Sequence, residues 1–284
     1  MSLPPRPGFE GIGPARLRVL GGPVLAELQS RFGDEAAAKV LAGEVLCADG
    51  SVVTATTALP AGASVYWYRD LPDEVPVPFG MPVLYRDENI VVVDKPHFLA
   101  TMPRGGHVVQ TALVRLRREL GLWELSPAHR LDRLTAGVLV FTARREVRGA
   151  YQTLFASGAV SKTYLARSSA GSLAEPVELR TRIIKRRGSL QALEEPGEVN
   201  AVTLVEPLGA GLFRLTPSTG RTHQLRVHMA SLGLPIDGDP LYPRVLDVAA
   251  DDFSTPLQLL AARLSFVDPV AGVSREFVSG RVLE

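Results

Sequence analysis

A charged cluster stands directly before an apolar run in the segment PAHRLDRLTAGVLVF, residues 127–141. Asp132 lies between Arg130 and Arg133 in a predicted loop, just ahead of a predicted buried strand. Neighbouring positive charge keeps a carboxylate ionised, and partial desolvation makes it more reactive. Asp132 is therefore a candidate nucleophile or base. The competing interpretation is a loop carboxylate that caps a turn or pairs with an arginine.

A second candidate lies in TPSTGRTHQLRVH, residues 216–228. A turn of serine, threonine and glycine that leads into a helix places backbone N–H groups and the positive end of the helix near Arg221. This arrangement suits Arg221 to hold either a phosphate or the carboxylate of Asp132. An ordinary capped helix, with Thr222 as its N-cap, explains the same residues equally well.

Tyr164, in the short segment KTYLA, is a third candidate. Alternation along a strand places Lys162, Tyr164 and Ala166 on one face. A tyrosine among small and aliphatic side chains usually packs in a core, unless its hydroxyl meets a reactive group. The residues alone leave both interpretations open.

Metal and nucleotide-cofactor chemistry find no support in the sequence. His223 and His228 are five residues apart, which does not place them on one helical face, and Cys47 is the single cysteine. The phosphate-binding patterns G-x-x-x-x-G-K-[ST] and strand-linked G-x-G-x-x-G are absent. A protein kinase is excluded because Leu131 separates His-Arg from the aspartate and the companion motifs are missing. We expect no metal and no nucleotide cofactor.

Charge is distributed unevenly, although the net charge of the 284 residues is only +1. Residues 101–190 hold 16 arginines and lysines against 6 acidic residues, whereas residues 1–80 hold 6 against 9. A basic middle between acidic ends is typical of a polyanion-binding face in a nearly neutral protein. Solvated, arginine-rich helix faces are the alternative.

The composition is typical of a soluble globular protein, with 46% hydrophobic and 21% charged residues. No apolar run approaches the ~20 residues that cross a bilayer, and the first residues lack the apolar core of a signal peptide. We expect a cytoplasmic protein that does not associate with membranes.

A sheet must position the three candidates, because predicted strands outnumber predicted helices and follow one another as hairpins. This order favours an α+β domain on a largely antiparallel sheet over a doubly wound fold. Buried strands are predicted at NIVVVDKP and after Asp132, and amphipathic helices at TALVRLRRELG, which Gly121 ends, and at REVRGAYQTLFASG. The C-terminal tail is predicted to form a strand hairpin that turns at Asp268 and Pro269.

A further hairpin is predicted within residues 181–207, and it has an exposed basic tip. That tip consists of Lys185, Arg186 and Arg187. Near the start of the chain, residues 24–46 predict one amphipathic helix followed by strand-like pieces up to residue 67. The proline-rich residues 70–82 suit a linker, so we expect a small α+β module with its linker over residues 1–80 and a larger domain over residues 81–284.

Four segments in order resemble the RluA-type pseudouridine synthases. They are NIVVVDKP, HRLDRLTAGVLVF, SKTYLA and STGRTHQLRVHMASLGLPIDGDPLY, and the likeness runs from about residue 81 to the C-terminus. The resemblance implies the pseudouridine synthase fold, a largely antiparallel mixed sheet with flanking helices and a central cleft. It also implies isomerisation of uridine to pseudouridine in RNA, in which the base is cut from its sugar at nitrogen 1, turned, and rejoined through carbon 5.

Roles for the three candidates follow from this resemblance. Asp132 would be the catalytic aspartate, attacking either the sugar or the base. Tyr164 would pack against the target base and help to remove the proton from carbon 5. Arg221 would pair with Asp132 and hold it ionised. No cofactor is expected, because detachment and rejoining need only acid–base and nucleophilic groups.

The target uridine must leave its stack before Asp132 can reach it. The resemblance implies that Arg130 fills the resulting gap, since a guanidinium group stacks well on bases. The basic excess over residues 101–190 then serves to contact phosphates. The residues expected to bind RNA are His129, Arg130, Arg133, Lys162, Lys185, Arg186 and Arg187.

Two departures from the family pattern bear on substrate choice more than on chemistry. Ala136 follows Thr135 where the family often has serine, and His97 and Phe98 stand where small residues are common. Residues 24–67 also resemble, distantly, the small RNA-binding domain of the type found in ribosomal protein S four. Acidic residues outnumber basic ones there, so we expect a degenerate module that binds RNA weakly or serves only in packing.

We therefore expect a pseudouridine synthase that acts as a monomer on rRNA or tRNA. The alternative is an RNA-binding protein of the same fold that does not react, such as an RNA chaperone. A glycosidase of DNA or small nucleosides is a third possibility, which release of free base would distinguish.

Overall fold

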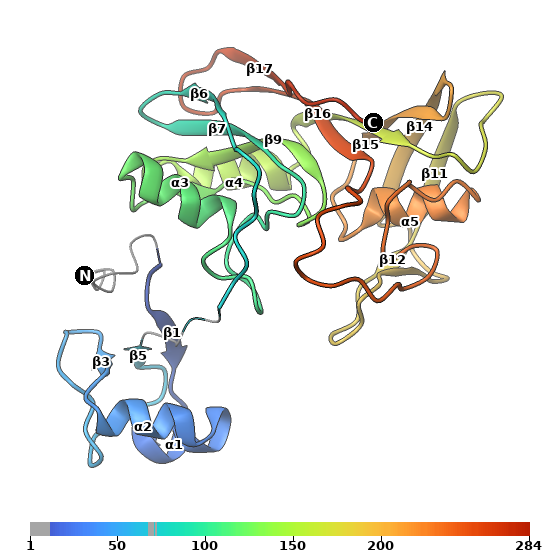
Figure 1. Ribbon diagram of the computed structural model, residues 1–284. Helices are drawn as coiled ribbons and strands as arrows, with labels where there is room; N and C mark the ends of the chain where they lie inside the picture. Colours follow the sequence, from blue (N-terminus) through green and yellow to red (C-terminus); the bar gives the residue numbers. More distant parts are fainter. Residues whose placement is uncertain (1–11, 68–70, 72) are drawn as a thin grey trace. The chain divides into compact units, whose positions relative to one another are not determined.

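The computed structural model describes residues 12–67, 71 and 73–284. The chain divides into two compact units, Met1–Asp73 with Arg117–Glu119, and Glu74–Leu116 with Leu120–Glu284 (Figure 1). Asp70 and Pro72 of the predicted linker lie outside the described residues, and the boundary near residue 80 stays a prediction. No helix in the described part of the chain is long and apolar enough to span a membrane.

The first unit is a small α+β module. Its elements are β1 (Ala15–Arg18), β2 (Gly22–Pro23), α1 (Val24–Phe32), α2 (Asp34–Leu41), β3 (Val45–Cys47), β4 (Ala58–Leu59) and β5 (Ser64–Trp67). Strands β1, β5 and β3 form an antiparallel sheet, and Val24, Leu28 and Val40 of the two helices pack in the core beside it.

The prediction of one helix over residues 24–46 is wrong. The chain forms two helices there, and a strand begins at Val45. Gly33 separates the helices with φ +80° and ψ −170°, a conformation that glycine adopts at little cost and that interrupts a helix.

The second unit is built on a ten-stranded mixed sheet. In spatial order its strands are β11 (Val177–Thr181), β14 (Ala201–Gly209), β15 (Leu212–Pro217), β10 (Val160–Arg167), β16 (Leu259–Val267), β9 (Ala136–Thr142), β7 (Ile90–Lys95) and β6 (Val83–Arg86), with β17 (Ser274–Val278) beside β16 and β8 (Ser126–Pro127) beside β9. Only the β16–β9 pairing is parallel within this sheet of the described chain. The prediction of an α+β domain on a largely antiparallel sheet is confirmed.

Three helices cover this sheet, and a short two-stranded arm extends from it (Figure 1). The helices are α3 (Ala112–Leu120), α4 (Arg148–Ala156) and α5 (Gln224–Ser231), and the arm pairs β12 (Ile183–Ile184) with β13 (Leu193–Glu194). The predicted helices at α3 and α4, the hairpin of β12 and β13, and the C-terminal hairpin of β16 and β17 are confirmed. At the tip between β12 and β13, Arg186 and Arg187 are exposed as predicted, whereas Lys185 is partly buried.

Strand β7 is buried on both faces, so its side chains alternate between two hydrophobic cores. Val91 and Val93 pack with residues of α3 and α5 in one core. Ile90 and Val92 pack with residues of α4 in the other. Burial of each such aliphatic side chain stabilises the folded state by about 1.5–3 kcal/mol. Because both faces of β7 are buried, the NIVVV run does not alternate between apolar and polar residues.

Gly137 fixes the start of β9 against β16. It has φ +113° and pairs in parallel with Ala261. A Cβ atom at this position would lie 2.2 Å from the carbonyl oxygen of Ala261, so no other residue fits without moving the strands. The segment before β9 is therefore held at a fixed place on the sheet.

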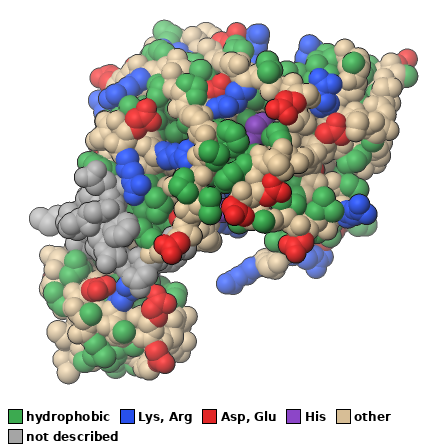
Figure 2. All heavy atoms as spheres, viewed as in Figure 1, with side chains coloured by type: hydrophobic (Ala, Val, Ile, Leu, Met, Phe, Trp, Pro, Cys, Tyr) green, Lys and Arg blue, Asp and Glu red, His purple; other side chains and the backbone are tan. Residues whose placement is uncertain are grey.

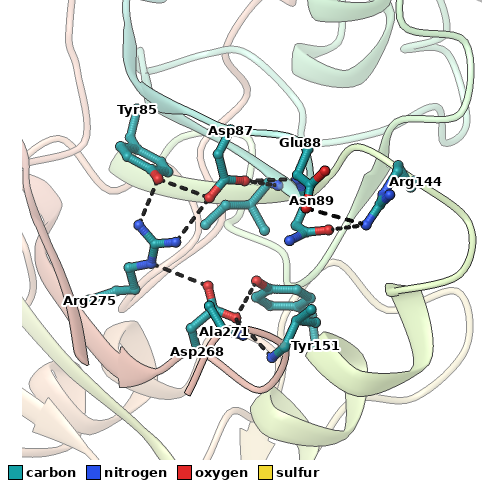
Figure 3. A network of polar contacts seen from close by, with 11 residues as sticks. Tyr85, Asp87, Glu88, Asn89, Arg144, Tyr151, Asp268, Ala271 and Arg275 are labelled. Atoms are coloured by element: carbon teal, nitrogen blue, oxygen red, sulfur yellow. Dashed lines mark hydrogen bonds and ion pairs between the residues drawn. The ribbon is translucent and has the colours of Figure 1, made fainter. Parts of the chain in front are cut away.

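A polar network joins the β6–β7 turn, α4 and the C-terminal hairpin (Figure 3). Arg275 donates to Tyr85 at 2.6 Å, to Asp87 at 3.0 Å and to Asp268 at 3.2 Å, and Tyr151 donates to Asp268 at 2.8 Å. Burial opposes ionisation of both aspartates, but hydrogen bonds from backbone and side-chain donors outweigh it and lower the pKa of each carboxyl group. Ion pairs and hydrogen bonds connect all of these side chains, so the network links the β6–β7 turn, α4 and the C-terminal hairpin to one another.

Removal of Arg275 leaves two ionised carboxylates without their cation. We expect Arg275→Ala to lower the free energy of unfolding by about 2–4 kcal/mol at pH 7, measured by chemical denaturation. Arg263→Ala is the matched control on the same hairpin: its pair with Glu276 is half exposed, so we expect less than about 1 kcal/mol. The difference should begin to narrow as the pH falls below the ordinary carboxyl pKa of 3.8, where the unfolded chain takes up protons, and it should be lost as the pH passes through the lower pKa values of Asp87 and Asp268 in the folded protein. Equal losses at pH 7 would contradict a stabilising network.

Candidate active site

A cavity of about 450 Å³ opens in the second unit where four segments meet. They are the loop before β9, strand β10, the turn between β15 and α5, and the loop that follows β7. Asp132, Tyr164, Arg221 and Arg226 all line it. The volume falls within the ~300–1,000 Å³ range of ligand pockets. The sheet therefore brings together the three candidates that the sequence singled out, although they are far apart along the chain.

Asp132 lies in a tightly held loop. The backbone N–H of Thr135 donates to the carbonyl of Asp132 at 3.1 Å, which closes a turn immediately before β9. The side chain of Asp132 is 34% exposed, so its carboxylate remains accessible from the cavity. The prediction of a partly buried carboxylate ahead of a buried strand is confirmed.

Arg226, in α5, is the cation beside Asp132. Its guanidinium forms a bidentate pair with Asp239 at 2.8 and 2.6 Å, and its Nη1 lies 3.7 Å from Oδ2 of Asp132. The side chain of Arg226 is only 3% exposed. Burial opposes its charge, but the two aspartates outweigh burial and raise the pKa of Arg226. A permanently charged arginine is thus fixed against the accessible carboxylate.

The expected pairing of Arg221 with Asp132 is wrong. Arg221 is exposed, and its Nε donates to the carbonyl of Asn200 at 3.0 Å. Its backbone N–H donates to Oε1 of Gln224 at 3.0 Å, so the glutamine side chain occupies the donor that was expected to hold an anion. Thr222 is not the N-cap either, because α5 begins at Gln224 after His223, which adopts a left-handed conformation with φ +59°.

Tyr164 reaches the site through the register of three strands. It lies opposite Ala261 on β16, and Ala261 lies opposite Gly137 on β9. This row across the sheet places the tyrosine near the end of the Asp132 loop. Burial, together with the negative charge of Asp132, raises the pKa of Tyr164, so its phenol is neutral at physiological pH.

His129 lines the cavity as an uncharged ring. Its Nε2 accepts a hydrogen bond from the backbone N–H of Val140 at 3.2 Å, and the ring stacks on Phe155 at 4.4 Å. Burial lowers the pKa of His129 to about 3, and the charge of Lys162 adds to the effect. His129 therefore brings no positive charge for a phosphate, which sets it apart from the other residues predicted to bind RNA.

The remaining predicted RNA-binding residues are distributed over the cavity and the arm. Arg130 is exposed, and Arg133 and Lys162 are partly buried; all three line the cavity. Figure 2 shows basic side chains at the end of the arm between β12 and β13. In this arm Lys185 donates to the carbonyl of Ser189, Arg186 pairs with Glu195 at 2.6 Å, and Arg187 is exposed.

Several residues of the site escaped the sequence analysis. Lys95, at the end of β7, is fully buried and donates to the carbonyl of Arg133 at 3.2 Å. This hydrogen bond helps to hold the loop that carries Asp132. His223, which the sequence analysis considered only as a metal ligand, shares a hydrogen bond of 2.9 Å with the hydroxyl of Tyr242. A charged residue among apolar neighbours on a helix, as Arg226 is in QLRVHM, was the available signal for a buried pair.

Among the described residues, no group of three or more histidine, cysteine, aspartate or glutamate side chains has a geometry that could hold a metal ion. The side chains that line the cavity include a carboxylate, guanidinium groups and a phenol.

Comparison with known proteins finds that this chain is similar to enzymes named for RNA modification. A family model described as RNA pseudouridylate synthase matches residues 89–231. The chain is 34% identical over 212 residues to tRNA pseudouridine synthase C of Vibrio vulnificus, which covers 66% of this chain and 86% of that protein. It is 31% identical over 213 residues to the dual-specificity RNA pseudouridine synthase RluA of Haemophilus influenzae, covering 69% and 91%.

A solved structure supports the same fold. Human RNA pseudouridylate synthase domain containing 4 superposes with a TM-score of 0.54 at 26% identity, covering 71% of this chain and 88% of that chain. The cavity and its loops lie largely within the matched segment, since Asp132, Tyr164 and Arg226 all fall between residues 89 and 231.

Because Arg226 is buried and Arg221 is exposed, we expect their substitutions to lower the free energy of unfolding by different amounts. Arg226→Ala leaves Asp239 buried without its partner, so we expect the free energy of unfolding to fall by about 3–5 kcal/mol. Arg221→Ala removes one exposed hydrogen bond and should cost at most about 1 kcal/mol. Urea denaturation of both variants measures the difference. A larger loss for Arg221→Ala would contradict the assignment.

Proposed function

Because the chain belongs to the RNA pseudouridylate synthase family, we propose that it isomerises uridines of rRNA or tRNA to pseudouridine, with Asp132 as the catalytic aspartate. One observation carries this proposal. Asp132 is an accessible carboxylate in a cavity, 3.7 Å from a buried arginine whose charge is fixed by a second aspartate. A carboxylate held in this way is ready to attack the sugar or the base of a uridine.

In this proposal Arg226 takes the role that the sequence gave to Arg221. The bidentate pair with Asp239 fixes the position of the guanidinium, and the longer contact leaves Asp132 free to react. Fixed charges next to a reacting group stabilise the charge that develops during reaction without reorganising. Arg226 is therefore a positioning and electrostatic residue for Asp132.

Tyr164 is assigned to the target base. Its neutral phenol lies in the same cavity as Asp132 and offers a flat, largely apolar surface for a pyrimidine. A neutral phenol is a weak base, which favours packing over direct removal of the proton from carbon 5.

RNA enters this site with the uridine turned out of its stack. We assign Arg130, which is exposed at the cavity, to the gap that the uridine leaves. The phosphate contacts are assigned to Arg133, Lys162 and the basic tip of the arm. The neutral His129 is assigned to the wall of the cavity rather than to phosphate.

The first unit is proposed to bind RNA weakly or to serve in packing. Of its few basic side chains, Arg31 pairs with Glu27 at 2.6 Å, and Lys39 is buried and lies 3.3 Å from Glu44. These pairs reduce the charge available for phosphate. A cytoplasmic location and a monomeric state remain proposals from the sequence.

The direct test is release of tritium from RNA that carries tritium at carbon 5 of its uridines. We expect wild-type protein to release tritium from unmodified rRNA or tRNA, and Asp132→Asn to reduce the rate by at least about 1,000-fold, because the amide is no nucleophile. Asp251→Asn is a matched control, since Asp251 is exposed and does not line the cavity that contains Asp132.

An Asp132→Asn variant with wild-type turnover would contradict the assignment of the catalyst. The alternative is an RNA chaperone of the same fold. It would be favoured if the wild-type protein formed no pseudouridine on any RNA and if wild type and Asp132→Asn bound RNA with equal affinity. Mapping of pseudouridine in total RNA from cells with and without the protein identifies the target positions.

A further inference from the structure

His223 is a residue of the cavity that the proposed mechanism does not use. A second cavity, of about 740 Å³, adjoins the cavity that contains Asp132, because some residues line both. These shared residues are Asp132, Arg133, His223 and Arg226. A nucleotide held against Asp132 therefore lies in the space that His223 borders.

The backbone of His223 has a conformation that few residues other than glycine adopt. Its φ of +59° and ψ of 15° lie in the left-handed region, directly before α5 begins at Gln224. Such a conformation costs free energy, and residues that keep one cluster at functional sites. Glycine would adopt it without strain. The presence of a histidine here indicates that the ring has a use.

Tyr242 determines which nitrogen of the His223 ring carries the proton. The tyrosine hydroxyl accepts a hydrogen bond from the N–H of Ala192 at 2.7 Å and donates its single proton to the carbonyl of Ala192 at 2.9 Å. Nδ1 of His223 lies 2.9 Å from the same hydroxyl, so Nδ1 must be the donor in this contact. Tyr242 is itself buried, and the guanidinium of Arg226 lies 5.3 Å from the centre of its ring.

The ring of His223 is neutral at physiological pH. Burial lowers the pKa of His223 from its ordinary value of 6.5. The carboxylates of Asp132 and Asp239 oppose this shift, and the cations Arg226 and Lys185 add to it. In a neutral imidazole with its proton on Nδ1, the other nitrogen, Nε2, accepts hydrogen bonds.

Nε2 of His223 is open to the cavity. Within the described part of the chain it has no hydrogen-bond partner, and it is not among the buried side-chain atoms that lack one. An uncharged acceptor thus faces the space beside Asp132. An internal uridine of RNA has two groups that could donate to it, the N3–H of the base and the 2′-hydroxyl of the sugar.

We propose that Nε2 of His223 accepts a hydrogen bond from one of these two donors of the target uridine, and that Tyr242 positions the ring for this contact by binding Nδ1. The inference rests on the proposed function, because the ligand is the uridine of that site. Contact with N3–H excludes cytidine, whose N3 is an acceptor, and contact with the 2′-hydroxyl excludes DNA. In both cases His223 contributes to the choice of substrate.

The test is equilibrium binding of synthetic RNA that contains the uridine identified by the mapping experiment above. All proteins carry Asp132→Asn, so that no uridine is converted during the measurement. The RNAs have uridine, 3-methyluridine or 2′-deoxyuridine at the target position, so each modified RNA lacks one donor. We expect His223→Asn to weaken binding of unmodified RNA about tenfold, the effect of one hydrogen bond. Asparagine tolerates the left-handed backbone, so the turn is kept.

A double-mutant cycle between protein and RNA identifies the donor. Removal of the bound donor should weaken binding about tenfold to the protein with His223 and have little further effect on His223→Asn. The modified RNA that shows this coupling tells whether the base or the sugar is bound. Independent effects for both modified RNAs, or an unchanged affinity of His223→Asn, would overturn the proposal. Tritium release by the wild-type protein would still support the proposed function.

His107→Asn is the matched control for the cycle. Like His223, His107 is partly buried and lines the cavity that contains Asp132. Its backbone pairs with Arg104, but its ring has no hydrogen bond to the groups around Asp132. We expect no coupling between His107→Asn and either modified RNA. Coupling of equal size at His107 would mean that any change to the cavity wall has this effect, and would overturn the assignment to His223.

Nitrogen-15 NMR of histidine-labelled protein tests the role of Tyr242 without RNA. The chain has five histidines, so His223→Asn identifies the signals of His223. We expect a proton on Nδ1 and none on Nε2 at pH 7. In Tyr242→Phe, which keeps the ring but not the hydroxyl, we expect a mixture of both tautomers and RNA binding weakened a few-fold.

A wild-type His223 ring that carries its proton on Nε2 would overturn the proposal. An unchanged tautomer and an unchanged RNA affinity in Tyr242→Phe would overturn the positioning role of Tyr242.

Discussion

The site depends on a buried guanidinium shared by two unequal partners. Asp239, which is fully buried, neutralises Arg226 through a close bidentate pair, while Asp132 lies at 3.7 Å and stays one-third exposed. A buried charge without a partner is very costly, so the Arg226–Asp239 pair must form whenever the domain folds. The consequence is a cation of fixed position beside a carboxylate that is still free to react.

The sheet determines where this carboxylate lies. Gly137 allows β9 to approach β16 so closely that a Cβ atom would collide with Ala261, and the same row of the sheet continues to Tyr164. Lys95 donates to the carbonyl of Arg133 in the loop of this carboxylate, and the hydroxyl of Thr101 donates to the carbonyl of Leu131, directly before Asp132. The loop that carries Asp132 is irregular, but Lys95, Thr101 and Leu131, which hold it, are buried, and this suits the function proposed above.

Local sequence patterns were sufficient for the strands around the site and for the position of Asp132 in a loop before a buried strand, because charge before an apolar strand is visible in the chain. They were insufficient for Arg226, since the choice between two arginines depends on where α5 begins and on Asp239, thirteen residues further along. Thr222 has the chemistry of an N-cap, but the Gln224 side chain satisfies the N–H group of Arg221 instead. Gly33 likewise ends a helix that the apolar periodicity would continue. In each case a tertiary or backbone constraint overrides a local preference.

The most direct test of the central claim compares single-turnover rates of pseudouridine formation at saturating RNA for Arg226→Gln and Arg221→Gln, with circular dichroism to establish that both variants are folded. We predict a loss of at least about 100-fold for Arg226→Gln, because Asp132 loses its fixed cation, and at most a few-fold loss for Arg221→Gln. A folded Arg226→Gln variant with a near wild-type rate, or a greater loss for Arg221→Gln, would contradict the proposed role of Arg226 as the partner of Asp132.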